Sequence, residues 1–433
     1  MKKQASGRLP LALQLAAIAD GVTSVAFYGY GPLYLRQVLH EQHLLVVALV
    51  NTLAALATFI AAGIWGRLSD RTGKPLPLMA TGLFGMALAL LLIPFMPSST
   101  GFLLMGLLLF TMLAAVSPLG VAWSTTLAPD HPSEQAALFY RMRSAGWAVG
   151  SFGCSALVHY LDSGGITVAF RLGTALTALA GISLLLYVTG EKRRLRKKEE
   201  RVGPDQPDSS ATLDSSAASD PSASPRPQST ASNFEGLSAG LVWRLPIVAA
   251  IAGAVLFAMG GNEAFFSLLG PYLTEELRVP SSWVGLTLGT ASVLNIAITR
   301  LAGRFADRHG PTLVFLIGTW SYTIIFAAMI IFGNPFLTMI LYALPISALI
   351  STGASGALST FVPAHQRAEA IGAFEGSVAL SMATGSLLSG WVVDQLGLHF
   401  LPAITFAITV PGALIAWFAV YRRFGKQKRR EYQ

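Results

Sequence analysis

The chain has 433 residues, of which 53% are hydrophobic and 12% are charged, and its mean hydropathy is +0.57. Soluble globular proteins carry about 25% charged residues, so this composition excludes a water-facing surface of ordinary size. The net charge of +8 therefore indicates basic residues sorted to one side of a bilayer rather than a nucleic-acid partner.

Motifs for common chemistry are missing from the sequence. The single cysteine, Cys154, excludes an intramolecular disulfide and a cysteine-ligated metal site. Neither HExxH nor GxxxxGK[ST] occurs, which argues against a metalloprotease and against ATP-driven pumping by this chain alone. We expect no cofactor, no metal and no catalytic residue, and hence no enzyme.

Twelve segments are long and apolar enough to cross a membrane, which takes about 20 residues. They are 10–35, 45–66, 76–96, 101–127, 139–161, 166–189, 246–273, 282–302, 311–332, 336–361, 368–393 and 400–421. The first is too long for a cleaved signal peptide and is interrupted by Asp20. The sequence therefore predicts an all-α membrane protein with twelve transmembrane helices.

Basic residues in the loops predict the orientation. With the N-terminus in the cytoplasm, 27 basic residues fall inside, Arg141 and Arg143 among them, and three fall outside, namely Arg36, Arg171 and Arg278. This asymmetry follows the positive-inside rule. We expect both termini to be cytoplasmic, in a membrane that we take to be the bacterial inner membrane.

A polar stretch divides the chain into three parts: an N-terminal six-helix bundle (1–190), a linker (191–244) and a C-terminal six-helix bundle (245–433). The linker is rich in Ser, Ala, Pro and Asp from Pro204 to Ser232, and such a composition cannot bury a core. We expect a largely disordered cytoplasmic linker, whose basic start at Lys192 anchors it at lipid headgroups.

The two halves repeat each other. Gly66-Arg67-Leu68-Ser69-Asp70-Arg71-Thr72-Gly73 is matched by Gly303-Arg304-Phe305-Ala306-Asp307-Arg308-His309-Gly310, at an offset of 237. Gly31-Pro32 is echoed by Gly270-Pro271, and Ala128-Pro129 by Val362-Pro363, in the same order and at nearly the same offset. Parallel repeats of this kind are typical of transporters with two pseudo-symmetric halves.

The segment from Gly66 to Lys74 reads G-x-L-x-D-R-x-G-K and resembles the signature loop of the major facilitator superfamily, with its weaker repeat at Gly303 to Gly310. The resemblance covers essentially the whole chain. It implies a monomeric secondary transporter whose halves rock around a central site, lined by the first, fourth, seventh and tenth helices.

The same resemblance implies that Asp70 faces the N-terminus of the eleventh helix, where a carboxylate is favoured by the helix dipole. We predict a gating group of Gly66, Asp70, Arg71 and Gly73, with Asp307 and Arg308 in the repeat. Gly66 would allow a close helix approach, and Gly73 would allow a turn with positive φ. Alternatively, the basic residues of the loop only set the topology.

Three acidic residues fall at membrane depth, where ionisable groups are costly and are treated as functional. Asp20 lies roughly 15 Å into the first span at 1.5 Å per residue, Glu263 lies in the seventh span, and Glu375 in the eleventh. We predict that Asp20 and Glu263 couple proton movement to substrate movement. They could instead pair with a cationic substrate or form structural ion pairs.

Aromatic residues accompany these acids in the first and seventh spans. They are Phe27, Tyr28, Tyr30, Phe265 and Phe266, with Asn262 beside Glu263. Aromatic walls with few polar groups suit an amphipathic organic substrate, although packing between helices is the alternative for each residue.

The sequence therefore favours a secondary transporter that moves small organic molecules, with protons and membrane lipids as its other partners. Proton-coupled export is the leading prediction. Asp20 supports it, but exporters of the family commonly carry an Arg inside the fourth helix and a Gly-Pro pair in the fifth, and both are missing here. Proton symport of a sugar, nucleoside or organic anion, and a non-transporting sensor or scaffold, remain as alternatives.

Overall fold

The computed structural model describes residues 9–127, 132–201, 242–363 and 366–425. The N-terminal part comprises α1 (Leu11–Gln37), α2 (Leu44–Thr72), α3 (Pro75–Leu92), α4 (Ser99–Leu113), α5 (Ser117–Leu127), α6 (Pro132–Leu161) and α7 (Ser163–Arg201). The C-terminal part comprises α9 (Pro246–Ser267), α10 (Leu269–Pro271), η2 (Tyr272–Glu276), α11 (Ser282–His309), α12 (Pro311–Phe332), α13 (Pro335–Tyr342), α14 (Ile346–Phe361), α15 (Arg367–Leu396), α16 (Leu401–Ile415) and η5 (Ala416–Gly425). These residues contain no strand, so the predicted all-α class is confirmed.

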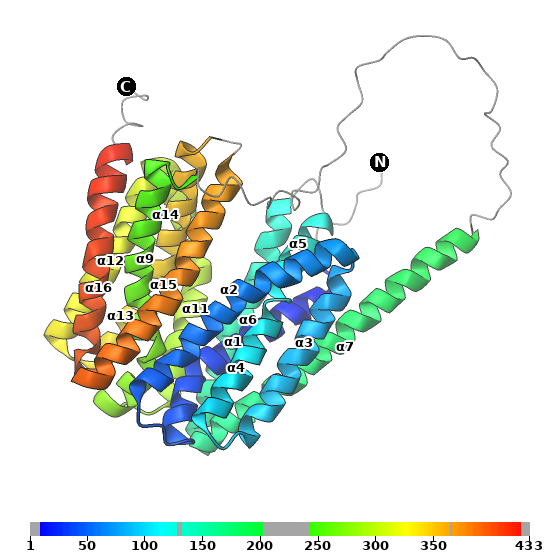
Figure 1. Cartoon of the computed structure of the whole chain (residues 1–433), viewed down its shortest axis with the longest axis horizontal. Coiled ribbons are helices and arrows are strands. Elements are labelled where there is room, and N and C mark those ends of the chain that lie inside the picture. Colours follow the sequence, from blue (N-terminus) through cyan, green and yellow to red (C-terminus); the bar gives the residue numbers. More distant parts are fainter. Residues whose placement is uncertain (1–8, 128–131, 202–241, 364–365, 426–433) are drawn as a thin grey trace, which may run out of the picture.

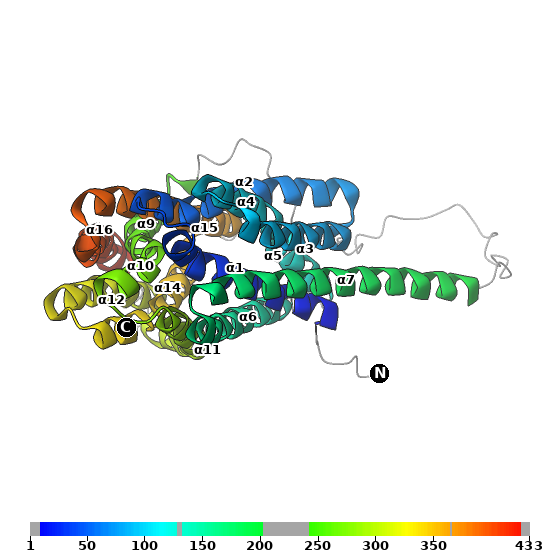
Figure 2. The ribbon, with the colours of Figure 1, turned by 90° about the horizontal axis from the view of Figure 1, so that it is seen from below.

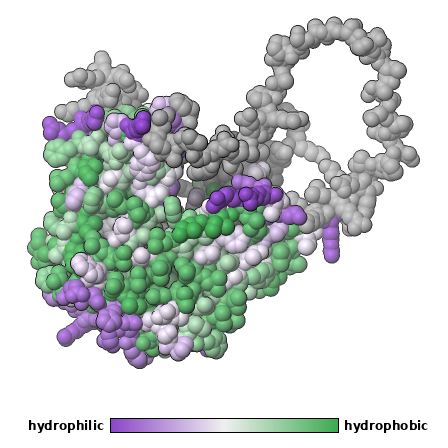
Figure 3. Space-filling model, viewed as in Figure 1, coloured by the Kyte–Doolittle hydropathy of each residue, from purple (hydrophilic) through white to green (hydrophobic). Residues whose placement is uncertain are grey.

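Eleven helical stretches of the described chain have the length and apolar content of a membrane span. The one predicted span that is not among these eleven is the fifth, 139–161, which corresponds to α6; this helix has 30 residues and carries Arg141 and Arg143. Large apolar side chains such as Leu186, Ile331 and Phe332 are at least 65% exposed along the helices, and Figure 3 shows an apolar belt between polar ends. An apolar surface of this extent fits lipid rather than water.

The helices form two groups that meet mainly along two pairs of helices (Figures 1 and 2). In the first group α1 packs against α6 and α7, and α3 packs against α4 and α7. In the second group α9 packs against α15 and α16, and α12 packs against α14. The main contacts between the groups are α2 with α15 and α6 with α11.

Three spans predicted as continuous are broken near their middle or outer part. The fourth span divides into α4 and α5, the tenth into α13 and α14, and the seventh into α9, α10 and η2. Pro118, Pro345 and Pro271 lie at or beside these breaks. Proline lacks an N–H donor and clashes with the preceding turn, which explains why the helices end there.

The linker begins later than the sequence predicted. Helix α7 continues eleven residues beyond position 190, through the basic run, to Arg201. Lys, Arg and Glu are strong helix formers, so a helix that has already nucleated in the bilayer extends through them. Of the remaining predicted linker residues, 202–241 lie outside the described residues, whereas 242–244 are described and lead into α9.

Candidate functional site

The two ends of the helix bundle differ in how closely the groups approach. We call the end with the α2–α3 turn at Gly73 and the α11–α12 turn at Gly310 the Gly73 end. We call the opposite end, where α1 finishes beside Arg36, the Arg36 end. Figure 1 shows the two helix groups diverging towards the Gly73 end.

A cavity of about 1500 Å³ lies between the groups on the Gly73 side of the molecule. Its described lining comes from α1, α2, α4, α5, α6, α9 and α11–α15, and includes Val242 and Trp243 just before α9. Helices α3, α7 and α16 contribute no described lining residue. The cavity is thus a path between the two groups that is accessible from the Gly73 end.

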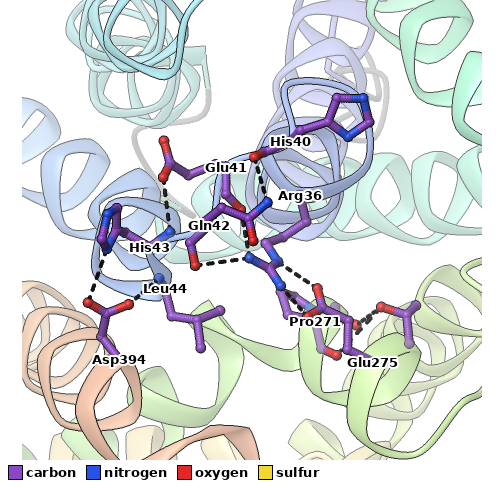
Figure 4. A network of polar contacts seen from close by, with 11 residues as sticks. Arg36, His40, Glu41, Gln42, His43, Leu44, Pro271, Glu275 and Asp394 are labelled. Atoms are coloured by element: carbon purple, nitrogen blue, oxygen red, sulfur yellow. Dashed lines mark hydrogen bonds and ion pairs between the residues drawn. The ribbon is translucent and has the colours of Figure 1, made fainter.

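An ion pair between the two groups closes the Arg36 end (Figure 4). Arg36 at the end of α1 donates from Nε to Glu275 Oε1 of η2 over 2.6 Å, and from Nη2 to Oε2 over 2.5 Å. Its Nη1 also donates to the backbone oxygens of Glu41 and Gln42, at 2.6 and 3.0 Å. Such a two-pronged guanidinium–carboxylate contact fixes geometry as well as charge.

Asp394 of α15 makes a second cross-group contact at this end (Figure 4). Its Oδ1 accepts the Leu44 amide hydrogen at the start of α2 over 2.7 Å, and its Oδ2 lies 3.5 Å from His43 Nδ1. A carboxylate there satisfies a free N–H of the first helical turn and interacts favourably with the helix dipole. Asp394 therefore ties α15 to α2.

Glu41 in the α1–α2 loop is held as a carboxylate. Burial opposes its ionisation, but hydrogen bonds from the Ser99 side chain and from the backbone amides of His43 and Gln42 lower its pKa below the usual value. The loop thereby keeps its shape next to the Arg36–Glu275 pair.

We call the surface where the two groups meet the seam. The space around individual glycines shows where the seam is closely packed and where it is open. A Cβ at Gly390 of α15 would lie 2.4 Å from Ala48 Cβ of α2, and one at Gly285 of α11 would lie 2.3 Å from Ser151 O of α6. At Gly66, by contrast, a Cβ would meet no described atom within 4 Å. The close approach that the sequence predicted at Gly66 is absent in this conformation, because the groups diverge at that end.

Asp20 is fully buried behind the cavity wall rather than on it. Its Oδ1 accepts Arg143 Nε of α6 over 3.1 Å and Ser24 Oγ over 3.1 Å, and its Oδ2 accepts Ser117 Oγ of α5 over 2.5 Å. Arg143 and Ser117 line the cavity, whereas Asp20 does not. The carboxylate is thus already neutralised by a guanidinium and two hydroxyl donors.

Glu263 lies on the cavity wall and has no counter-ion among the described residues. It is 8% exposed; in the described part of the chain, Asn262 Nδ2 approaches its Oε1 at 3.4 Å, and Oε2 has no hydrogen-bond partner there. Tyr28, Tyr322 and Tyr342, which come from α1, α12 and α13, line the same cavity. A buried, incompletely bonded carboxylate of this kind is costly and is typical of functional sites.

Two further carboxylates, Glu375 and Glu369 of α15, line the wider part of the cavity. Glu375 is exposed, whereas Glu369 is partly buried and its Oε1 has no partner among the described residues. The sequence predicted Glu375 but not Glu369.

Of the predicted aromatic residues, Tyr28 and Phe266 line the cavity. Tyr28 lies 4.5 Å from Phe110, 6.5 Å from Trp147 and 6.4 Å from Phe266, measured between ring centroids. These four rings, from α1, α4, α6 and α9, form a cluster that bridges the two groups. We call it the aromatic cluster.

The other predicted aromatic residues serve packing instead. Phe27 stacks on Phe102 at 5.0 Å, and Phe265 packs against Phe326 at 5.4 Å, each fully buried. Tyr30 is fully buried beside Gly285 at the closed seam. Residues adjacent in sequence point in different directions around a helix, so Phe27, Tyr30 and Phe265 do not line the cavity although Tyr28 and Phe266 do.

The predicted gating residues lie at the Gly73 end. Gly73 caps the end of α2 with φ +62°, the positive value that the sequence predicted. Its N–H donates to Ser69 O over 2.8 Å. The side chains of Asp70, Arg71, Asp307 and Arg308 are exposed, and no described residue forms an ion pair with them. In this conformation the gating group is unengaged.

Arg143 is the main site residue that the sequence did not indicate. The fifth span was predicted from position 139, which placed Arg143 only about one turn inside the span, among the cytoplasmic basic residues, but α6 begins seven residues earlier at Pro132. Arg143 therefore lies about three turns inside the helix, at 3.6 residues per turn. The signal available was an acid in the first span that needs a partner. Trp147, Tyr322 and Tyr342 were missed because apolar spans contain many such residues.

Comparisons with known proteins agree with this architecture. The family described as "MFS_1 like family" matches residues 23–406. An uncharacterised MFS-type transporter of Methanocaldococcus jannaschii is 22% identical over 383 residues, 87% of this chain and 90% of the relative. A candidate proline/betaine transporter of Staphylococcus aureus is 26% identical over 186 residues, which span 41% of this chain and only 40% of the relative's length.

The crystal structure of the nucleoside transporter NupG superposes with a TM-score of 0.71, covering 94% of this chain and 97% of that structure at 14% identity. At this identity the likeness concerns the fold, and it confirms the predicted arrangement of two six-helix bundles. With a family match over most of the chain, apolar spans and a central cavity, this chain belongs to the major facilitator superfamily and is an integral membrane transporter.

Proposed function

We propose that this transporter exports small amphipathic organic molecules in exchange for protons, and that Glu263 is the group that takes up and releases the proton. The observation that carries the proposal is the position of Glu263, on the cavity wall with Oε2 unbonded by any described residue. Asp20 is a weaker candidate than the sequence suggested, because Arg143 already neutralises it.

The proposed cycle moves two helix groups, α1–α7 and α9–η5, as rigid units around the cavity. A lone carboxylate is costly in low dielectric unless it is protonated or paired. When the groups close around the cavity, Glu263 loses contact with water, so closure requires either a proton or cargo on it. Exchange follows if the two occupy the carboxylate in alternate half-cycles.

The proposed orientation places the Gly73 end in the cytoplasm. Basic residues are concentrated in the loops that lie at the Gly73 end of the molecule, and the positive-inside rule assigns such loops to the cytoplasm. The described conformation is then inward-open, and cargo enters the cavity from the cytoplasm. The proposed location is the bacterial inner membrane.

The test is transport in proteoliposomes under an imposed pH gradient, with ethidium, uridine and xylose as probes. We expect at least one solute to move against the direction of proton flow, with proton movement recorded by an entrapped pH dye. This readout does not depend on how the protein is oriented in the vesicle. Solute and protons moving in the same direction would identify a symporter instead, and transport indifferent to the pH gradient would contradict coupling.

The Arg36–Glu275 ion pair predicts a conformational effect. Arg36→Glu should open the Arg36 end, because it places two carboxylates together where the guanidinium now bridges the groups. Distances between spin labels on α1 and η2 would report the opening, and the swap variant Arg36→Glu/Glu275→Arg should recover most of the closed population. Unchanged distances in Arg36→Glu would show that the pair does not hold this end shut.

Asp70 predicts the converse effect at the Gly73 end. Asp70→Asn should slow transport without lowering expression, because the carboxylate is proposed to engage the start of α15 only when that end closes. The closed state would lose a contact of typically 0.3–1 kcal/mol, so we expect a slowing of about two- to fivefold. Asp307→Asn is the matched variant in the repeat, and wild-type rates in Asp70→Asn would remove the gating role.

A further inference from the structure

We infer that the cargo is an organic cation, bound with its positive charge at Glu263 and its apolar groups against the aromatic cluster. This inference deepens the proposed function and depends on it, because it names the substrate class of the same cavity. It rests on the charge of the lining, the aromatic residues that share the cavity wall with Glu263, and the size of the cavity.

The described cavity wall is negatively charged. It carries three carboxylates, Glu263, Glu369 and Glu375, against one guanidinium, Arg143. Arg143 is already paired with the buried carboxylate of Asp20 at 3.1 Å, so these two charges cancel and three negative charges remain. A low-dielectric cavity concentrates such a field, which attracts cations and repels anions.

Glu263 differs from an acidic residue on the protein surface because it is buried and lacks a counter-ion among the described residues. It is 8% exposed, it faces the cavity, and its Oε2 has no hydrogen-bond donor among the described residues. A neutral cargo would leave the ionised carboxylate without a counter-ion, and an anion would add repulsion. A cation is the cargo whose binding removes the cost of the buried charge.

Aromatic groups complete the site. The aromatic cluster places Tyr28 within 6.5 Å of the rings of Phe110, Trp147 and Phe266, measured between centroids, and all four rings line the same cavity as Glu263. The faces of Trp, Tyr and Phe attract cations, and sets of such rings recognise quaternary ammonium groups. The same rings bury the apolar parts of the cargo.

The cavity volume, about 1500 Å³, exceeds the 300–1,000 Å³ range of ordinary ligand pockets. The described lining contains ten aromatic residues, drawn from both helix groups and including the four of the aromatic cluster. This wall suits a bulky cation whose charge is shielded by apolar groups better than a small hydrated one.

The test compares two ions of nearly the same shape and opposite charge, tetraphenylphosphonium and tetraphenylborate. Equilibrium binding is measured on the full chain in nanodiscs, with binding to empty nanodiscs subtracted. We expect saturable binding of tetraphenylphosphonium and at least tenfold weaker binding of tetraphenylborate. Glu263→Gln should weaken tetraphenylphosphonium binding by about tenfold or more, as expected when one partner of a desolvated charge pair is removed.

Two variants separate a charge effect from a folding defect. Glu263→Asp keeps the carboxylate and should retain binding within a few-fold of the wild type. Glu276→Gln removes an exposed acid outside the cavity with the same change of charge, and should leave binding unchanged. Equal losses in Glu263→Gln and Glu276→Gln would overturn the inference, since charge at the cavity would then carry no special role.

Stronger binding of tetraphenylborate, or equal binding of the two ions, would also overturn it. The proposed function fails in a different way. Proton-driven transport of uridine or xylose without tetraphenylphosphonium binding would support proton-coupled transport and contradict the inference that the cargo is a cation. Binding of tetraphenylphosphonium with no proton-coupled movement of any probe would retain the cation site and remove the proposed exchange.

Discussion

Replacing Arg143 with alanine should destabilise the protein by about 3–5 kcal/mol, the range measured when one partner of a buried ion pair is removed. Asp20 is fully buried and would lose the one cationic partner that it has among the described residues, keeping hydrogen bonds from Ser24 and Ser117. We expect a value at the lower end of the range, because the Arg143 side chain is 30% exposed to the cavity. Unfolding of purified protein, followed by thermal or denaturant titration, would measure it.

The matched control removes both charges. Asp20→Asn/Arg143→Gln leaves a neutral polar pair of similar volume, so no uncompensated charge remains buried. The double variant should therefore be more stable than Arg143→Ala. If the single and double variants were equally unstable, shape rather than charge would hold α1, α5 and α6 together.

Glu263→Gln should abolish most of the coupling between proton and solute movement. The side chain keeps its size and loses its charge and its ability to carry a proton. A coupling free energy of 1–3 kcal/mol corresponds to about 5–150-fold, so pH-driven transport in proteoliposomes should fall by a factor in that range. The comparison requires wild-type protein reconstituted at the same density.

Asp20→Asn is the discriminating companion to this variant. Because Asp20 is paired with Arg143 and does not line the cavity, its neutral variant should keep pH-driven transport per folded molecule, although Arg143, left without its partner, lowers the stability of the protein. Glu263→Asp should keep it as well. Retained coupling in Glu263→Gln combined with loss in Asp20→Asn would reverse the assignment and make Asp20 the proton-carrying group.

The difference between Asp20 and Glu263 shows which properties of a buried acid can be predicted from the sequence and which cannot. Asp20 and Glu263 lie in corresponding spans and look equivalent along the chain. In the structure one is neutralised by a helix more than a hundred residues away, and the other is left unpaired on a cavity wall. Their distinction depends on Arg143, whose depth was hidden because the start of α6 was placed too late.

The contacts that close the Arg36 end also could not be predicted from the sequence. Arg36 and Glu275 are 239 positions apart, and Asp394 lies 350 positions from the Leu44 amide that it accepts. Each belongs to a short loop or helix end that looks like ordinary polar surface. Only the approach of α1 to η2 and of α2 to α15 makes them a connection between the two groups.

The sequence by itself determined the membrane environment, the twelve spans, the repeat and the signature turn at Gly73. These features arise from local composition and periodicity, because a helix in lipid satisfies its own backbone hydrogen bonds and needs only a long apolar run. The tertiary structure alone decided which buried acid is neutralised, which aromatic rings reach the cavity, where helices break and which end is closed. Those properties depend on charges and rings brought together from distant helices, and a pattern along one chain carries no record of such distances.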